Sequence, residues 1–433
     1  MPTSTRSKRV LLYSHDSFGL GHVSRCRTIA NAIVEADQSV SVLILSGSPV
    51  VGSYEFRSGV DFVRIPGVVK IDTGEYDSAN LRMNVEHTLE MRTRIIRDTA
   101  DIFRPDLFIV DKEPLGLRGE VGPALRLLKD RGTPLVLGLR DVMDDPAQLA
   151  KEWERKNVVP ALRDIYDEIW VYGLPQINKP LTGIDVPPSV RHKMVYTGYL
   201  RRELPLHAEV PHEMEEIDGP FILVTPGGGG DGVELVDWVL AAYETDPNIP
   251  YGAVIVFGPF MPATAREAFK ERAAKFPNIR TLTFTNNLGA LMHRAAGVVA
   301  MGGYNTFCEI LSFDKRAIIV PRTHPRLEQF IRARAARNIG LIEMLDPGRG
   351  LDPQAMATAL RHLPQQGLPS DVVVPGLLDG LGSVWRLVSK QLSHPHRRPA
   401  SLEATEATEA TGANIGGELA SADPAPLPGR ART

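Results

Sequence analysis

The stretch that decides the fold runs from Arg9 to Ala36 and reads RVLLYSHDSFGLGHVSRCRTIANAIVEA. Its apolar beginning, RVLLYS, predicts a strand, and apolar residues recur at helical spacing in its second half, which predicts a helix. The loop between them carries Gly19 and Gly21 and is followed by His22. A glycine-rich turn from a strand into a helix is a common place for a ligand in sheets built from β-α-β units.

The same alternation of strand and helix patterns continues along most of the chain. Apolar runs of strand length lie at residues 9–14, 40–46, 106–111, 134–141, 168–173, 221–226, 251–258, 279–285, 297–303 and 316–322. Strands that alternate with helices favour parallel sheets covered by helices on both faces. The sequence therefore predicts an α/β protein.

A polar stretch with several prolines follows residue 200 and divides the pattern into two series. We expect a Rossmann-like domain at residues 1–200, a linker at 201–218 and a second Rossmann-like domain at 219–370. A helical pattern predicts a closing helix at 371–393. The last residues, 394–433, repeat the letters EAT and contain almost no large apolar side chain, which predicts a disordered tail.

The composition excludes several classes of protein. The net charge is −3 over 433 residues, so no global field attracts nucleic acid. The two cysteines, Cys26 and Cys308, are too far apart in sequence to suggest a zinc motif, and they fit a reducing compartment. No apolar run approaches the roughly 20 residues of a membrane helix. We expect a cytoplasmic protein, with peripheral contact at the inner face of the membrane left open.

The first loop does not fit two common nucleotide-binding motifs. A dinucleotide fingerprint would continue to a third glycine where Ser24 stands, and would need an acid after the second strand, which instead ends in LILSGSP. No glycine here is followed by the Lys-Ser or Lys-Thr pair of a phosphate-binding P-loop. The loop therefore predicts a different kind of ligand.

Two further glycine loops follow strands of the second series. The first, TPGGGGDG, places four glycines after a buried-type strand, where their backbone amides could approach an anion; a flexible turn is the alternative. The second, AMGGYNTFCEIL, predicts a helix that starts near Asn305 or Thr306. A helix N-terminus carries free amides and a partial positive charge, which suits a diphosphate.

The roles of two acids stay open at this point. Glu309 could hold the two hydroxyls of a ribose, or it could form a capping box with Thr306 and bond only the backbone. Glu328 and its neighbour Gln329 could bind sugar hydroxyls, but Glu328 could also pair with Arg332 on a solvated helix face.

Taken together, these motifs resemble those of the GT-B glycosyltransferases. The closest resemblance is to the peptidoglycan-type N-acetylglucosaminyltransferases of family 28 and to a group known only as predicted glycosyltransferases. The glycine–His loop, the second-domain glycine loop, the pattern GG-x-x-T-x-x-E and the acid–Gln pair occur in this order between residue 9 and about residue 350. The resemblance implies two facing Rossmann-like domains with the active site in a cleft between them.

The resemblance also implies a donor site, mostly on the second domain. Glu309 would hold the ribose, Glu328 and Gln329 would face the donor sugar, and the segment that begins at Asn286 would lie against the base. The implied donor-binding residues are Gly21, Gly227, Gly228, Gly229, Gly230, Asn286, Leu288, Gly302, Gly303, Asn305, Thr306, Glu309, Glu328 and Gln329.

The acceptor hydroxyl needs a base, and His22 is the first candidate because histidine titrates near neutral pH. His22 could equally be a polar contact to the donor, and Asp16 is the second candidate for the base. Charged residues at the ends of two predicted strands could bind the acceptor or simply form ion pairs and caps there. These acceptor candidates are Asp111, Arg140 and Asp141.

We therefore expect a transferase that moves a hexose-type sugar from a nucleotide sugar, UDP-linked, to a hydroxyl of a glycan, a lipid-linked sugar or a small molecule. A helix N-terminus and backbone amides can stabilise the departing diphosphate, so we expect no cofactor and no metal. The alternatives are a sugar-nucleotide 2-epimerase or hydrolase on the same fold, and a protein that binds nucleotide sugars without catalysis.

Overall fold

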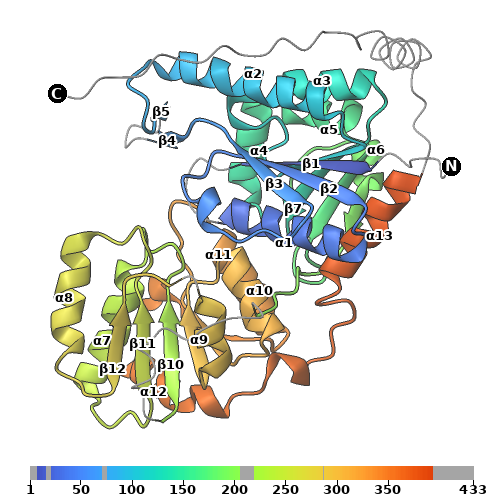
Figure 1. Cartoon of the computed structure of the whole chain (residues 1–433). Helices are drawn as coiled ribbons and strands as arrows, with labels where there is room; N and C mark the ends of the chain where they lie inside the picture. Colours follow the sequence, from blue (N-terminus) through green and yellow to red (C-terminus); the bar gives the residue numbers. More distant parts are fainter. Residues whose placement is uncertain (1–6, 16–20, 71–75, 205–218, 286, 394–433) are drawn as a thin grey trace, which may run out of the picture. The chain divides into compact units, whose positions relative to one another are not determined.

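A parallel sheet of seven strands is built from the first half of the chain (Figure 1). The computed structural model describes residues 7–15, 21–70, 76–204, 219–285 and 287–393. In spatial order the strands are β3 (Val60–Arg64), β2 (Val40–Ser46), β1 (Lys8–Ser14), β6 (Leu107–Asp111), β7 (Leu135–Arg140), β8 (Glu168–Tyr172) and β9 (Met194–Tyr196). The chain order reverses between β1 and β6, and this switch point is where open α/β sheets bind ligands.

A second parallel sheet has six strands and the same kind of switch point. Its order is β12 (Ile279–Leu282), β11 (Gly252–Val256), β10 (Phe221–Thr225), β13 (Gly297–Ala300), β14 (Ala317–Ile319) and β15 (Glu343–Met344). Here the reversal lies between β10 and β13, the two strands that precede the second and third glycine loops. The predicted α/β class with Rossmann-like parallel sheets is confirmed.

Several short strands were not predicted from the sequence. They are β3, β9 and β15 at the sheet edges and the antiparallel pair β4 (Val68–Lys70) and β5 (Tyr76–Ser78). Each is short and lacks a long apolar run, because an edge strand is covered less completely than a central one.

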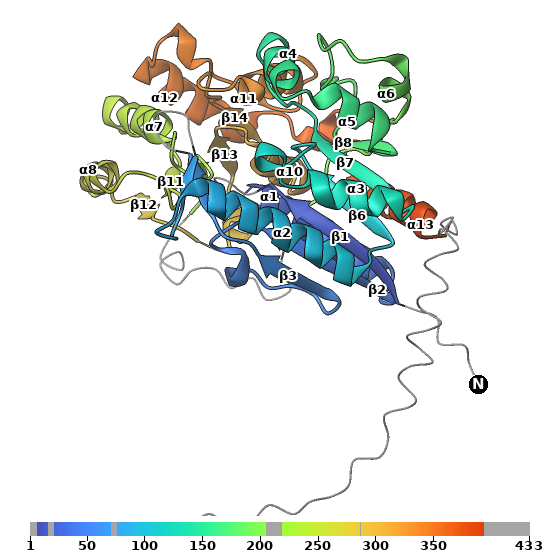
Figure 2. The same cartoon turned by 90° about the horizontal axis from the view of Figure 1, so that it is seen from above.

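Helices cover the sheets, as the apolar periodicity predicts. In the first half they are α1 (Gly21–Ala36), α2 (Val85–Phe103), α3 (Gly122–Asp130), α4 (Pro146–Arg155), α5 (Val158–Asp164) and α6 (Pro188–His192). The second half contributes α7 (Val233–Thr245), α8 (Ala263–Ala273), α9 (Leu288–Arg294), α10 (Tyr304–Ser312), α11 (Glu328–Asn338), α12 (Pro353–His362) and α13 (Gly380–Ser393). Helices α2 and α3 pack together over one face of the first sheet, which Figure 2 shows from above.

One apolar cluster contains side chains from both sheets. Leu12 of β1 and Ile29 of α1 belong to it, together with Leu223 of β10, Phe307 of α10 and Val388 of α13. All five side chains are at most 1% exposed. This packing brings α1 against α10, so the helices that follow the first and third glycine loops are neighbours (Figure 1). The domain division at residues 200 and 219 stays a prediction.

The closing helix begins later than the sequence pattern suggested. It starts at Gly380 rather than near residue 371, after a turn in which Gly376 has a left-handed φ of 76°. Gly380 packs directly on the main chain of Tyr199, since a Cβ there would lie 2.4 Å from the Tyr199 carbonyl oxygen. The helix therefore begins at a residue without a side chain, whose main chain can lie directly against that of Tyr199. The expected tail, 394–433, lies outside the described residues.

Candidate active site

The first glycine loop and the end of β6 meet at the switch point of the first sheet. Strand β1 lies between β2 and β6, so the helix that follows β1 starts beside the last residue of β6. His22 is the second residue of α1 and Asp111 is the last of β6. The His22 Nδ1 and Asp111 Oδ2 atoms are 2.5 Å apart. The other candidate base, Asp16, lies outside the described residues.

Arg25 holds the same carboxylate from one turn further along α1. Its Nε donates to Asp111 Oδ1 at 2.7 Å and its Nη2 donates to Asp111 Oδ2 at 2.6 Å. The Arg25 and Asp111 side chains are 2% and 3% exposed, so this is a buried two-pronged ion pair. Asp111 is thereby fixed in position beside His22, and acceptor binding by Asp111 stays a prediction.

The electrostatics of this group favour a neutral imidazole. Burial lowers the pKa of His22, and the Arg25 charge lowers it further, while the hydrogen bond and the charge of Asp111 act in the opposite direction. The pKa of Asp111 lies well below its usual range because Arg25 and His22 together outweigh its burial. Arg25 Nη2 also lies 3.0 Å from His22 Nδ1. The ionised Asp111 can only accept, so Nδ1–H donates to it and the lone pair stands on Nε2, which makes no hydrogen bond to the described residues.

A second histidine packs against the first. The rings of His15 and His22 meet edge to face with centroids 5.7 Å apart. His15 is buried, and its Nδ1 lies 3.4 Å from the hydroxyl oxygen of Tyr13. Burial lowers the pKa of His15 to about 3, so this ring stays neutral and supports His22 without adding charge.

The third glycine loop presents the open N-terminus of α10. The helix begins at Tyr304 with Gly303 as its N-cap, and no side chain caps it. Gly302 has a left-handed φ of 78°, and a Cβ there would lie 2.7 Å from Ile319 Cγ2, so only glycine fits. A Cβ on Gly303 would meet no described atom within 4 Å. The first-turn amides of α10 are therefore not capped by a side chain of the described residues, as at helix N-termini that bind anions.

The capping-box interpretation of Glu309 is wrong in this structure. Thr306 lies inside the helix rather than at its N-cap position, which Gly303 occupies. The Glu309 side chain is half-buried and makes no hydrogen bond or ion pair with the described residues, whereas its carbonyl oxygen accepts from the Phe313 amide. Burial raises its pKa, and the Arg202 charge opposes that rise. Ribose binding by Glu309 stays a prediction.

Helices α1 and α10 are joined at their N-termini by side-chain hydrogen bonds. Asn305 Nδ2 donates to the carbonyl oxygen of Gly21 at 3.0 Å. Arg202 Nη2 in turn donates to Asn305 Oδ1 at 2.8 Å, and the Arg202 backbone amide donates to Ser312 Oγ at 2.8 Å. The structure therefore brings two of the predicted loops together through Asn305 and Arg202.

The four-glycine loop lies next to the same helix. Gly227 and Gly229 have left-handed φ angles of 79° and 87°. A Cβ on Gly227 would lie 3.9 Å from Thr306 Oγ1 of α10, whereas a Cβ on Gly229 would lie 2.3 Å from the carbonyl oxygen of Phe257. The close packing explains glycine at 229 without a ligand. The position of Gly227 keeps this loop, with Gly228 and Gly230, beside the N-terminus of α10.

Asp141 belongs to a second buried ion pair. Arg332 donates from Nη2 to Asp141 Oδ1 at 2.6 Å and from Nε to Asp141 Oδ2 at 2.8 Å, and the Tyr199 hydroxyl donates to Oδ2 at 2.7 Å. Asp141 is completely buried. An acceptor could reach it only if this network opened. The expected pair of Glu328 with Arg332 on a solvated face is wrong, because Arg332 is buried and turned to Asp141.

The two buried arginines meet at one aromatic ring. The guanidinium carbons of Arg25 and Arg332 lie 5.4 and 5.7 Å from the ring centroid of Tyr304, within the range of cation–π attraction. Tyr304 is the first residue of α10. The ends of β6 and β7 are thus each connected to α10. The first connection runs through Asp111, Arg25 and Tyr304, and the second runs through Asp141, Arg332 and Tyr304.

The acid–Gln pair is held by one arginine. Arg322 Nη2 donates to Glu328 Oε1 at 2.5 Å, and the Arg322 backbone amide donates to Gln329 Oε1 at 3.1 Å. Arg322 also pairs with Asp231, which follows the four-glycine loop. The pKa of Glu328 is lowered because Arg140, together with other arginines, outweighs its burial. Both residues of the pair are buried, and sugar binding by them stays a prediction.

Comparison with known proteins agrees with this arrangement. Residues 221–362 match the model of the glycosyltransferase family 28 C-terminal domain. A protein of Methanosarcina acetivorans described as an uncharacterized glycosyltransferase is 22% identical over 415 residues, which cover 86% of this chain and 96% of the relative. The chain is a glycosyltransferase in which residues 221–362 match family 28.

Solved structures place this glycosyltransferase in the GT-B fold. Medicago truncatula UGT71G1, complexed with UDP-glucose, superposes with a TM-score of 0.61 at 13% identity over 91% of this chain and all (100%) of its own. Acinetobacter baumannii MurG superposes with a TM-score of 0.53 at 16% identity over 88% of this chain and 99% of its own. At these identities the likeness establishes the fold.

Sequence reasoning missed the arginines of the glycosyltransferase site. Arg25 and Arg332 stand inside helical patterns, where charged residues are normally assigned to the solvent face, and Arg202 stands in the expected linker. One signal was available for Arg25, because it follows His22 by three positions and so shares its helix face. Of the remaining expected residues, Leu288 is the first residue of α9 and packs on the core, and Asn286 lies outside the described residues.

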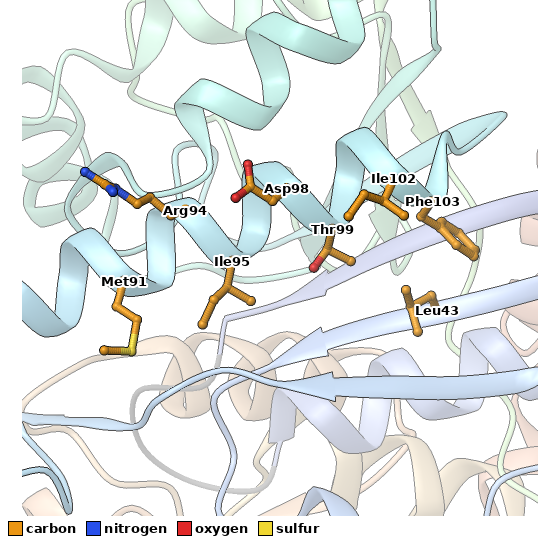
Figure 3. A pocket seen from close by; sticks show the side chains of 8 residues that line it. All are labelled: Leu43, Met91, Arg94, Ile95, Asp98, Thr99, Ile102 and Phe103. Carbon is orange, nitrogen blue, oxygen red and sulfur yellow. The ribbon is translucent and has the colours of Figure 1, made fainter. Parts of the chain in front are cut away.

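The structure also has a surface hollow that contains none of the predicted site residues. It measures about 460 Å³ and lies between α2 and β2 (Figure 3). Its lining residues are Leu43, Met91, Arg94, Ile95, Asp98, Thr99, Ile102 and Phe103. Among the described residues no helix is long and apolar enough to cross a membrane, and no group of three or more His, Cys, Asp and Glu side chains is placed to hold a metal ion.

Proposed function

We propose that this glycosyltransferase moves a hexose-type sugar from a UDP-sugar to a hydroxyl of an acceptor, without a metal ion and with His22 as the general base. The acceptor class comprises glycans, lipid-linked sugars and small molecules. The observation that carries the proposal is the distance of 2.5 Å between His22 Nδ1 and Asp111 Oδ2, at the switch point of the first sheet.

In this mechanism Asp111 orients His22 and stabilises its charged form. The Nδ1–H bond to Asp111 leaves the Nε2 lone pair to take the proton of the acceptor hydroxyl. The acceptor oxygen then bonds to C1 of the donor sugar, and the bond between C1 and the diphosphate oxygen breaks. The resulting imidazolium is favoured by the adjacent carboxylate, while Arg25 keeps that carboxylate ionised.

The N-terminus of α10 would receive the departing diphosphate. Its uncapped first-turn amides and helix dipole stabilise negative charge, which supplies the role that a metal plays in other transferases. Glu309 would take the ribose hydroxyls from the same helix, because its half-buried carboxylate has no partner among the described residues. Glu328 and Gln329 would bind hydroxyls of the donor sugar.

The competing functions fit the same residues less well. An epimerase needs a carboxylate or a second base near the sugar ring, but Asp111 and Asp141 are each held by a buried arginine. A protein that only binds nucleotide sugars would not need a neutral histidine oriented by a buried carboxylate. Both alternatives are nevertheless outcomes of one assay.

The test is incubation of the full-length protein with UDP-glucose and UDP-N-acetylglucosamine labelled in the sugar, with and without a panel of acceptors from the three classes. We expect label on an acceptor, with equal rates in buffer and in EDTA. Free labelled sugar alone would indicate a hydrolase, an isomerised donor an epimerase, and binding without turnover a non-catalytic protein. A requirement for magnesium or manganese would contradict the metal-independent mechanism.

A further inference from the structure

Several buried polar atoms around the active site have no hydrogen-bond partner among the described residues, and two of them carry opposite charges. These two are Nε of Arg140, the last residue of β7, and Oε2 of Glu328, the first residue of α11. The largest electrostatic effect on the pKa of each group comes from the other, so the two side chains lie near each other. The described residues form no ion pair between Arg140 and Glu328, whose Oε1 is held by Arg322 instead.

A second cation stands beside Arg140. The Lys112 amide donates to the carbonyl oxygen of Gly138 at 2.8 Å, which fixes Lys112 at the carboxyl end of β7. Its Nζ is 3.6 Å from Glu113 Oε1, too far for a hydrogen bond, and Glu113 already accepts from Lys156 Nζ at 3.0 Å. Lys112 therefore shares the Glu113 carboxylate with Lys156, and its side chain is 13% exposed.

Four neighbouring arginines are paired with acids, whereas Arg202 bonds Asn305 and Ser312. Arg25 is held by Asp111 and Arg332 by Asp141. The remaining two are Arg322, which pairs with Asp231 and Glu328, and Arg326, which pairs with Asp144 and Glu152. In the described part of the chain, Arg140 has no acid within ion-pair distance.

An unpaired cation in this position is costly unless a ligand compensates it. Burial lowers the pKa of Arg140 to about 10, a decrease that Glu328 limits, and burial lowers the pKa of Lys112 to about 8, a decrease that Glu113 limits most. Both groups therefore carry their charge at neutral pH. A partly desolvated cation without a counter-ion costs free energy, and an anion that binds to it recovers that cost.

We infer that Arg140, together with Lys112, binds an anionic group, a carboxylate or a phosphate, carried by one of the two sugars that the reaction joins. Glu328 Oε2 accepts a hydrogen bond from a hydroxyl of that sugar. The planar guanidinium suits this role because its parallel N–H bonds match the two oxygens of a carboxylate or a phosphate. The inference rests on the proposed function and adds the charge class of the substrate to it.

The first arm of the test asks whether the donor carries the anion. Binding of UDP, UDP-glucose and UDP-glucuronic acid is measured by calorimetry on the full-length protein and on the variants Arg140→Gln and Lys112→Gln. The matched control is Arg266→Gln, because Arg266 on α8 also has a buried Nε without a partner and shares no contact with this group. Melting temperatures confirm that each variant is folded.

A donor that carries the anion gives a clear pattern. UDP-glucuronic acid then binds the parent at least about tenfold more tightly than UDP-glucose, as a charged hydrogen bond permits. Arg140→Gln abolishes this preference, Lys112→Gln reduces it, and Arg266→Gln keeps it. The affinity for UDP alone stays the same in all four proteins.

The second arm asks whether the acceptor carries the anion. The protein saturated with UDP is titrated with glucose 6-phosphate and with glucose. A preference for glucose 6-phosphate that is present in the parent and in Arg266→Gln, and absent in Arg140→Gln, assigns the anion to the acceptor.

Three results overturn the inference. If neither arm shows a preference that depends on Arg140, no anionic sugar binds there. If Arg140→Gln weakens UDP as much as the sugar-bearing ligands, Arg140 contacts the donor diphosphate instead. If UDP itself does not bind the parent, the proposed donor is wrong and the inference fails with it, whereas UDP binding without a charge preference rejects the inference alone.

Discussion

The side-chain amide of Asn305 donates a hydrogen bond of 3.0 Å to the main-chain carbonyl oxygen of Gly21. These residues are separated by most of the chain, yet they join the first turn of α10 to the first turn of α1. The next residue after Gly21 is His22, and the residue before Asn305 is Tyr304, which contacts both buried arginines. The proposed base and the proposed diphosphate site are therefore mechanically linked.

Replacing His22 tests whether this residue acts in catalysis or in binding of the donor. We expect His22→Ala to lower turnover by about 10²–10⁴-fold, the usual contribution of a general base, with a much smaller change in donor affinity. Because burial and Arg25 lower the pKa of His22 below 6.5, kcat/KM should remain level at neutral pH and fall only as pH decreases below that value and the ring becomes charged. Steady-state kinetics and calorimetry with UDP-sugars measure both quantities.

A variant with both His22→Ala and Asp111→Asn tests whether Asp111 acts through His22. If Asp111 acts through His22, His22→Ala with Asp111→Asn is no slower than His22→Ala alone. A loss of donor affinity as large as the loss of rate would show that His22 is a binding residue.

Glu309→Gln tests the proposed ribose contact. The substitution keeps the size of the side chain and removes its charge, so we expect near-normal stability and donor binding weakened by about tenfold, since a charged hydrogen bond is stronger than a neutral one. A 2′-deoxyribose donor should lose less affinity in this variant than in the parent. Unchanged affinity for the ordinary donor would place the ribose elsewhere.

The buried pair of Asp141 and Arg332 is expected to be essential for folding stability. Arg332→Met leaves a completely buried carboxylate without its cation, which costs about 3–5 kcal/mol in the free energy of unfolding. Adding Asp141→Asn should restore part of that loss. Urea unfolding measures both, with Arg94→Met as control. Arg94 pairs with Glu90 on the surface, where the two side chains are 74% and 56% exposed, and its loss should cost about 0.5 kcal/mol or less.

If Arg332→Met and Arg94→Met lowered the free energy of unfolding by similar amounts, water would have access to Asp141. In that case the carboxylate would also be accessible to an acceptor, as the sequence first suggested.

His15 should make the fold sensitive to mild acid. Its pKa is about 3 in the folded protein against 6.5 in the unfolded chain, so the unfolded chain binds an extra proton once pH falls below 6.5. The stability that a neutral His15 provides is complete above pH 6.5 and decreases by about 1.4 kcal/mol at pH 5.5, continuing toward pH 3. His15→Gln should remove this component, whereas His87→Gln, at an exposed position on α2, should not. Chemical unfolding at pH 7.5 and 5.5 compares the three proteins, and equal pH dependence in all of them would show that His15 is protonated in the fold.

The sequence by itself determined the α/β class, the positions of most central strands and the glycine-rich turns that follow some of them. These features depend on local properties, because apolar periodicity reports which face of an element is buried and a left-handed turn such as that at Gly302 accepts little but glycine. The motifs also sufficed to suggest a glycosyltransferase, which the family comparison supports.

Only the tertiary structure decided which charged groups are partners. Asp111 and His22 are 89 positions apart, and Asp141 and Arg332 are 191 apart, so no helical or strand period relates them. Their contacts depend on the strand order, which places β6 beside β1 and the end of β7 against α11. Spacing alone paired Glu328 with Arg332 because the two share a helix. Burial turned Arg332 to Asp141 instead, since a desolvated carboxylate requires a cation more strongly than a surface acid does.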